Sequence, residues 1–122
     1  MTDIGFILLY VEDPALSEKF YARLFGRPAN ESSPSFVMFA MPSGLMFGLW
    51  RRANVAPAAT PSGGGELAFA LEDRPTVEAR HIEWRDLGIK ILQPPTALDF
   101  GYAFTAADPD GHRLRVFAPE AR

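Results

Sequence analysis

The sequence contains no cysteine and only two histidines, His81 and His112, among its 122 residues. The lack of cysteine excludes a disulfide scaffold, a thiol nucleophile, an iron–sulfur cluster and cysteine-ligated zinc. Because histidine is a common metal ligand, two histidines also leave few ways to build a metal site.

Positive charge and long apolar runs are also scarce. Lys and Arg total 12 against 15 Asp and Glu, which gives a net charge of −3. A nucleic-acid or anionic-membrane surface would need a basic footprint, and a membrane-spanning helix needs about 20 consecutive apolar residues. The first residues, MTDIGFILLYVEDP, also lack the basic stretch and cleavage site of a signal peptide. We therefore expect a cytoplasmic protein with neither a nucleic-acid nor a membrane partner.

An internal duplication divides the chain. The segment 7–13 (ILLYVED) is similar to 67–73 (LAFALED), and 36–50 aligns with 103–117 around a Pro-x-Gly turn in each copy. Each copy reads as a strand, a helix and three strands. We predict one domain over residues 1–122, with module 1 at about 1–50, a linker at 51–65 and module 2 at about 66–122.

Helix signals follow the first strand of each copy. Asp13 suits an N-cap and Pro14 the first turn, and Leu16, Phe20 and Leu24 form an apolar stripe. The second helix is predicted at about 74–87.

Alternation along the four long strands assigns residues to two faces of the sheets. One face is wholly apolar and suits packing against the helices. The other mixes aromatic, small and charged residues, which fits a partly wet pocket better than core or open surface. In addition, Phe100, Tyr102 and Phe104 are predicted to share one face of their strand, where they either line the cavity or fill the core. The candidate ligand-binding residues are Phe6, Met46, Gly48, Trp50, Glu66, Tyr102, Phe104, Arg113, Arg115 and Phe117.

Two motifs, together with the duplication, resemble the vicinal oxygen chelate superfamily, which includes glyoxalase I, extradiol dioxygenases and bleomycin resistance proteins. The motifs are VEDPALSEKFYARLFG at 11–26 and DPDGHRLRVFAP at 108–119. The resemblance implies an α+β fold in which two paired βαβββ modules form curled mixed sheets around a cavity. It also implies a homodimer.

The metal-dependent members take their ligands from positions that correspond here to Phe6, Gly48, Glu66 and Arg115. Only Glu66 could bind a metal ion, and Arg115 would repel one. We therefore predict no metal, no cofactor and no catalytic residue. Glu66 and Arg115 are expected to form an ion pair.

The predicted function is metal-free binding of a small planar or aromatic ligand, a drug or a metabolite, of the kind found in bleomycin resistance proteins. The ion pair could simply neutralise itself. Alternatively, Arg115 and Arg113 anchor an anionic or carbonyl group while Phe6, Trp50 and Phe117 stack on the ligand. An enzymatic alternative stays open: a glyoxalase-like lyase, isomerase or dioxygenase that uses Glu66 with a metal or in acid–base chemistry. So does a structural or interaction module with a vestigial cavity.

Overall fold

The computed structural model describes residues 2–61 and 63–120. The chain forms two compact units, Met1–Ser62 (unit 1) and Gly63–Arg122 (unit 2). The boundary between them falls within residues 51–65. Each unit is described by itself.

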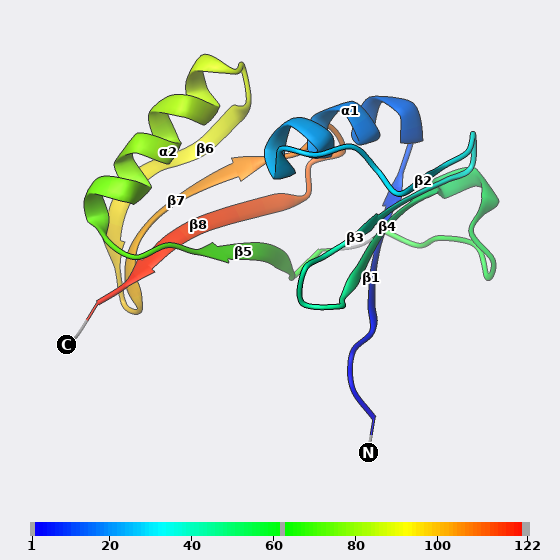
Figure 1. The fold of residues 1–122 in the computed structure, drawn as a ribbon, viewed down its shortest axis with the longest axis horizontal. Coiled ribbons are helices and arrows are strands. Elements are labelled where there is room, and N and C mark those ends of the chain that lie inside the picture. The colour runs from blue at the N-terminus through cyan, green and yellow to red at the C-terminus, as the bar shows by residue number, and fades with distance from the viewer. Residues whose placement is uncertain (1, 62, 121–122) are drawn as a thin grey trace. The chain divides into compact units, whose positions relative to one another are not determined.

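Unit 1 is one helix on a four-stranded mixed sheet with the order β1-β4-β3-β2 (Figure 1). Strand β1 runs parallel to β4, and the other neighbours are antiparallel. A short 3-10 helix, η1, follows the last strand. The elements are β1 (Phe6–Val11), α1 (Pro14–Phe25), β2 (Glu31–Ser32), β3 (Phe36–Ala40), β4 (Met46–Arg51) and η1 (Arg52–Asn54).

Unit 2 repeats this arrangement, with the strand order β5-β8-β7-β6 and β5 parallel to β8. Figure 1 shows α2 lying along its sheet. The elements are β5 (Glu66–Ala70), α2 (Arg74–Asp86), β6 (Lys90–Leu98), β7 (Gly101–Ala107) and β8 (Arg113–Pro119). The predicted α+β class and the βαβββ order of both copies are therefore confirmed.

Side-chain caps begin both helices. The Asp13 carboxylate accepts a hydrogen bond from the backbone N–H of Ala15 at 3.1 Å, and Asp73 accepts one from Thr76 at 2.9 Å. These bonds satisfy donors that the first helical turn leaves unpaired. The predicted apolar stripe is wrong at Leu16, which is 53% exposed, whereas Ser17 is fully buried. Successive helical residues are about 100° apart, so Leu16 points away from the sheet when Ser17 faces it.

Aromatic rings fill the space between each helix and its sheet. In unit 1, the rings of Tyr21 and Phe47 lie 4.8 Å apart between centroids. In unit 2, Trp84 packs edge-on against Phe104 at 5.3 Å. The predicted apolar sheet face is thus the one that each helix covers. Within residues 2–61 and 63–120, neither α1 nor α2 packs against the opposite face of its own sheet, which is called the helix-free face below.

No helix among residues 2–61 and 63–120 combines the length and the apolar character needed to cross a membrane.

The turn between β6 and β7 requires a glycine. Leu98 pairs with Gly101, so Asp99 and Phe100 alone connect the strands. Gly101 has a φ of 156°, and a Cβ there would lie 2.1 Å from the backbone oxygen of Ala118. No side-chain rotation can relieve such a contact, because both atoms belong to rigid parts of the chain.

Gly101→Ala should therefore lower the free energy of unfolding by at least about 2 kcal/mol, measured by urea denaturation. Gly63→Ala is the matched control, because a Cβ at Gly63 meets nothing within 4 Å. Equal stability of the two variants would contradict the close packing of β7 on β8.

Candidate functional site

The helix-free face of unit 1 is apolar. Phe6, Leu8 and Tyr10 alternate along β1 on this face, beside Met46, Gly48 and Trp50 of β4. Phe6 is 44% exposed and Leu8 is 42% exposed. Trp50 meets Tyr10 edge-on, with 6.3 Å between ring centroids. Contiguous exposed apolar side chains of this size are typical of surfaces that bind a ligand or a partner.

Gly48 lies beneath this apolar layer. A Cβ on Gly48 would lie 2.6 Å from Cδ2 of Leu8 and 2.9 Å from Cζ of Phe36. Glycine therefore allows the two side chains to close over the strand. The backbone at this position is covered by carbon atoms.

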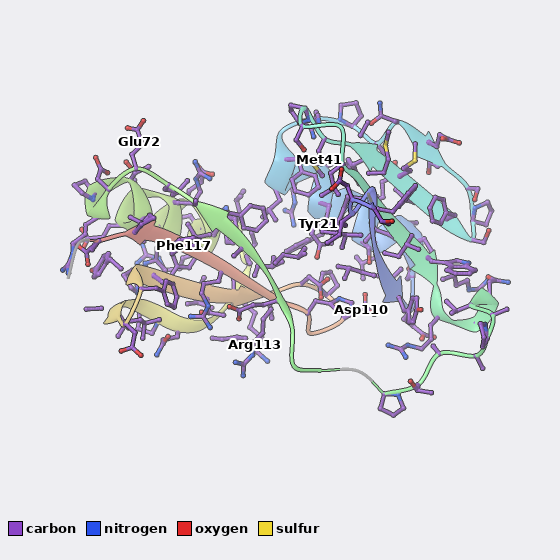
Figure 2. The ribbon with its side chains drawn as sticks, turned by 90° about the horizontal axis from the view of Figure 1, so that it is seen from below. Tyr21, Met41, Glu72, Asp110, Arg113 and Phe117 are labelled. Atoms are coloured by element: carbon purple, nitrogen blue, oxygen red, sulfur yellow. The ribbon has the colours of Figure 1, made fainter. Side chains whose placement is uncertain are left out.

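The helix-free face of unit 2 carries charge among small residues. Arg113, Arg115 and Phe117 alternate along β8 on this face, next to Glu66, Ala68 and Ala70 of β5. Figure 2 shows Arg113 and Phe117 extending from β8. These side chains lie on the sheet face that was predicted from the alternation to mix aromatic, small and charged residues.

Glu66 and Arg115 form a bidentate ion pair across the two strands. Arg115 Nε donates to Oε1 of Glu66 at 2.5 Å, and Nη2 donates to Oε2 at 3.1 Å. The predicted pair is confirmed. The Glu66 side chain is 31% exposed and that of Arg115 is 16% exposed, so the pair lies at the surface of the sheet but is partly shielded from water.

This pairing lowers the pKa of Glu66 below its ordinary value. The largest cause is the hydrogen bond from Arg115; partial burial acts in the opposite direction, and the charges of Arg115 and Arg113 lower the pKa further. A carboxylate that holds its charge so firmly is a weak base. The geometry therefore does not favour Glu66 as a proton acceptor in catalysis.

A pocket of about 550 Å³ opens next to this ion pair. Its lining residues are Glu66, Ala97, Leu98, Asp99, Phe100 and Arg115. Phe100 is 44% exposed and meets Phe117 edge-on, with 5.5 Å between ring centroids. Ala97, Leu98 and Asp99 were missing from the predicted ligand-binding set, because they belong to a strand end and a turn where alternation gives no direction. Phe100 was predicted either to line the cavity or to fill the core, and it lines this pocket. The Asp-Phe-Gly sequence before β7 was the available signal for a tight turn.

Tyr102 and Phe104 lie on the other side of the sheet. The Tyr102 hydroxyl donates to Glu78 of α2 at 2.8 Å, and Phe104 is fully buried against Trp84. The prediction that Phe100, Tyr102 and Phe104 share a face is therefore wrong. A residue in a turn does not continue the alternation of the strand that follows, so Phe100 folds toward Phe117 while the other two rings face α2.

Thr105 adds a buried polar group beside Arg115. The two residues pair directly in the β7–β8 ladder, so their side chains share a face of the sheet. Thr105 is 3% exposed, and its hydroxyl has no hydrogen-bond partner among the described residues. A buried hydroxyl without a partner is unusual in a folded protein.

A second pocket, of about 790 Å³, lies in unit 1 where α1 begins. Glu12, Asp13, Glu18 and Arg51 contribute its charged groups. None of the predicted ligand-binding residues lines it, and Asp13 is already used to cap α1.

Asp108, Asp110 and His112 form a cluster in the β7–β8 turn, with potential metal-ligand atoms within 4.8 Å of one another. Asp108 Oδ1 accepts from the backbone N–H groups of Asp110 and His112, and its Oδ2 lies 2.7 Å from Nδ1 of His112. These contacts show that Asp108 organises the turn.

Comparison with known proteins agrees with this fold. Residues 3–116 match the Glyoxalase/Bleomycin resistance protein/Dioxygenase superfamily. The chain belongs to this superfamily. The match spans both βαβββ copies, and the resemblance drawn from the two sequence motifs is confirmed.

Three known proteins are similar to this chain. The phenazine antibiotic resistance protein EhpR of Enterobacter agglomerans is 28% identical over 112 residues, which are 89% of this chain and 86% of EhpR. A protein of Agrobacterium tumefaciens, solved by NMR, is 46% identical, with a TM-score of 0.90 over 99% of this chain and 100% of that one. A glyoxalase-related enzyme of Fulvimarina pelagi has a TM-score of 0.84 at 24% identity, over 97% and 88% of the two chains, and shares the fold.

The resemblance assigns the metal positions of the superfamily's metal-dependent enzymes to Phe6, Gly48, Glu66 and Arg115, and these residues do not suit a divalent ion. Phe6 offers no ligand, and the backbone of Gly48 is covered by Leu8 and Phe36. Both carboxylate oxygens of Glu66 accept hydrogen bonds from Arg115, whose permanent charge would repel a cation. A divalent ion needs several oxygen or nitrogen ligands, and the positions that either unit would contribute do not supply them.

Thr105→Val should raise the free energy of unfolding by about 1 kcal/mol, because it replaces an unpartnered buried hydroxyl with a methyl group of similar size. Urea denaturation measures the change. Thr96→Val is the matched control, since the Thr96 hydroxyl donates to the Pro94 carbonyl at 2.7 Å, and its loss should leave stability unchanged or lower it. A loss of stability in Thr105→Val would mean that its hydroxyl is satisfied.

Glu66→Gln should lower stability near neutral pH by less than about 1 kcal/mol, because the pair is partly exposed. A carboxylate with a lowered pKa in the folded state stabilises it above the pKa of the unfolded chain, and this contribution is lost as pH falls. The stability difference between wild type and variant should therefore shrink from pH 6 to pH 3 in chemical denaturation. A difference that stays constant across this range would contradict the assignment.

Proposed function

We propose that this protein binds a small planar aromatic compound without a metal ion and acts by sequestration, as a resistance protein does. The observation that carries the proposal is the Glu66–Arg115 pair, with bonds of 2.5 and 3.1 Å, at two positions that would serve a metal in the enzymes. This arrangement makes the site a polar anchor instead of a Lewis acid.

The aromatic character of both helix-free faces supports the class of ligand. Unit 1 offers Phe6, Tyr10 and Trp50, and unit 2 offers Phe100 and Phe117 near the charged pair. Small-molecule sites usually combine apolar and aromatic walls with a few polar groups that orient the ligand. Within unit 2, a flat ring can stack on Phe100 and Phe117 while the arginines bond to an anionic or carbonyl group.

The similarity to EhpR supports the biological role. That relative is a phenazine antibiotic resistance protein, and it aligns with 89% of this chain. Phenazines are planar tricyclic compounds, which fits the ligand class suggested by the aromatic side chains. We further propose that the protein is a cytoplasmic homodimer that binds a small ligand and has no cofactor and no nucleic-acid partner.

The enzymatic alternative gains no separate support. Catalysis by Glu66 would need a free carboxylate oxygen or a raised pKa, whereas both oxygens are bonded and the pKa is lowered. Binding is therefore the better account of the site.

Isothermal titration calorimetry with phenazine tests the proposal. Wild type should bind, and Phe100→Ala should weaken binding at least tenfold, about 1.4 kcal/mol, because it removes the aromatic ring that lines the pocket beside the ion pair. Leu16→Ala is the control: Leu16 is 53% exposed on α1, outside both helix-free faces, and its loss should leave the affinity unchanged.

Two results would contradict the proposal. One is the absence of binding by wild type to phenazine, to N-phenyl-1-naphthylamine, a second neutral aromatic, and to its sulfonated analogue 8-anilinonaphthalene-1-sulfonate. The other is a purified protein that carries near-stoichiometric metal and loses its ligand binding when the metal is removed.

A further inference from the structure

The pocket of unit 2 contains an arginine that is already occupied by a carboxylate. Two of the three guanidinium nitrogens of Arg115 donate to the two oxygens of Glu66. This is the geometry in which arginine binds a carboxylate, sulfonate or phosphate group of any origin. The pocket of about 550 Å³ opens directly beside the pair, with both residues in its lining.

The two partners of the pair are held unequally. Arg115 lies in the middle of β8, flanked by Ala68 of β5 and Thr105 of β7, and its side chain is 16% exposed. Glu66 is the first residue of β5, its side chain is 31% exposed, and it follows the glycines 63–65, where an added Cβ would meet nothing within 4 Å. Glycine allows the backbone wide freedom, so Glu66 can turn away at less cost than Arg115.

A polar group that lacks a partner lies next to the same arginine. The Thr105 hydroxyl is buried on the face that Arg115 occupies, and it makes no hydrogen bond with a described residue. Because folded proteins satisfy nearly all buried polar groups, this hydroxyl is a second, independent sign that the protein alone does not complete the hydrogen bonding at this site.

The charges around the pocket favour an anion once Glu66 turns away. Arg113 is on the same face and forms no ion pair within the described part of the chain, whereas Asp99 lines the pocket with a negative charge. The charge of Arg113 acts on Glu66, whose pKa it helps to lower. When Glu66 turns to solvent, the guanidinium group of Arg115 in the pocket lining loses its carboxylate partner, and an anionic group of the ligand can take that place.

We infer that Glu66 occupies the place of the ligand's own anionic group on Arg115, so that this pocket selects planar aromatic anions over their neutral analogues. The carboxylate or sulfonate of the ligand accepts the two N–H donors of Arg115 while its rings lie against Phe100. This inference rests on the proposed function and narrows its ligand class.

Two fluorescent compounds test the inference. 8-Anilinonaphthalene-1-sulfonate and N-phenyl-1-naphthylamine share a ring system and differ by one sulfonate, which stays ionised throughout the working range. Both are titrated into wild type and variants, and the ratio of the two affinities is the measure, because apolar faces bind either compound. Urea denaturation verifies that each variant is folded.

Glu66→Gln should raise the affinity for the sulfonate about tenfold, because the amide competes less well than the carboxylate for Arg115. The affinity for the neutral amine should stay within about twofold of the wild-type value. Arg115→Met should remove the preference for the sulfonate. Glu120→Gln is the matched control, because Glu120 forms a similar bidentate pair with Arg74 and its loss changes the net charge by the same amount. It should change neither affinity.

Equal binding ratios for wild type, Glu66→Gln and Glu120→Gln would overturn the inference and leave the proposed function standing, provided that the neutral amine binds. An equal rise in sulfonate affinity for Glu66→Gln and Glu120→Gln would also overturn the inference, because it would reflect the change in net charge alone. If neither compound nor phenazine binds to any form, the proposed function fails as well.

Discussion

The packing of one helix against one face of a four-stranded sheet is the constraint on which both units depend. Each unit buries its aromatic core there, with Tyr21 against Phe47 in unit 1 and Trp84 against Phe104 in unit 2. Because strand side chains alternate between the two faces of a sheet, every second residue points away from the helix and takes no part in this packing. The helix-free faces could therefore diverge without loss of the fold.

The two faces have diverged in chemistry. That of unit 1 is apolar, and glycine at position 48 allows Leu8 and Phe36 to close over the strand. That of unit 2 combines small side chains with Arg113, Arg115 and Glu66. In the proposed function, the guanidinium group of Arg115 paired with the carboxylate of Glu66 takes the place of the ligand set that a metal-dependent member of the superfamily would need. The charge of Arg115 favours anions at a place where a metal site must favour a cation.

Much of this could be predicted from the sequence, for physical reasons that are local. The duplication, the caps at Asp13 and Asp73, and the two faces of each strand follow from the spacing of residue types. The Glu66–Arg115 pair could also be predicted, because the offset between the copies places the two residues on neighbouring strands. To predict an ion pair of this kind, only the register of the two neighbouring strands must be known.

The sequence-based predictions fail where the regular spacing of a strand or helix ends, or where only tertiary packing decides the direction of a side chain. Leu16 fits an apolar stripe, yet α1 turns Ser17 toward the sheet. Phe100 has the spacing of Tyr102 and Phe104, but it belongs to a turn and packs on Phe117. The sequence by itself determined the superfamily, the order of the elements and the charged pair, because these depend on patterns along the chain. Only the tertiary structure decided which rings line the pocket and that Thr105 is buried without a partner, because turns and close packing set these directions through contacts between distant residues.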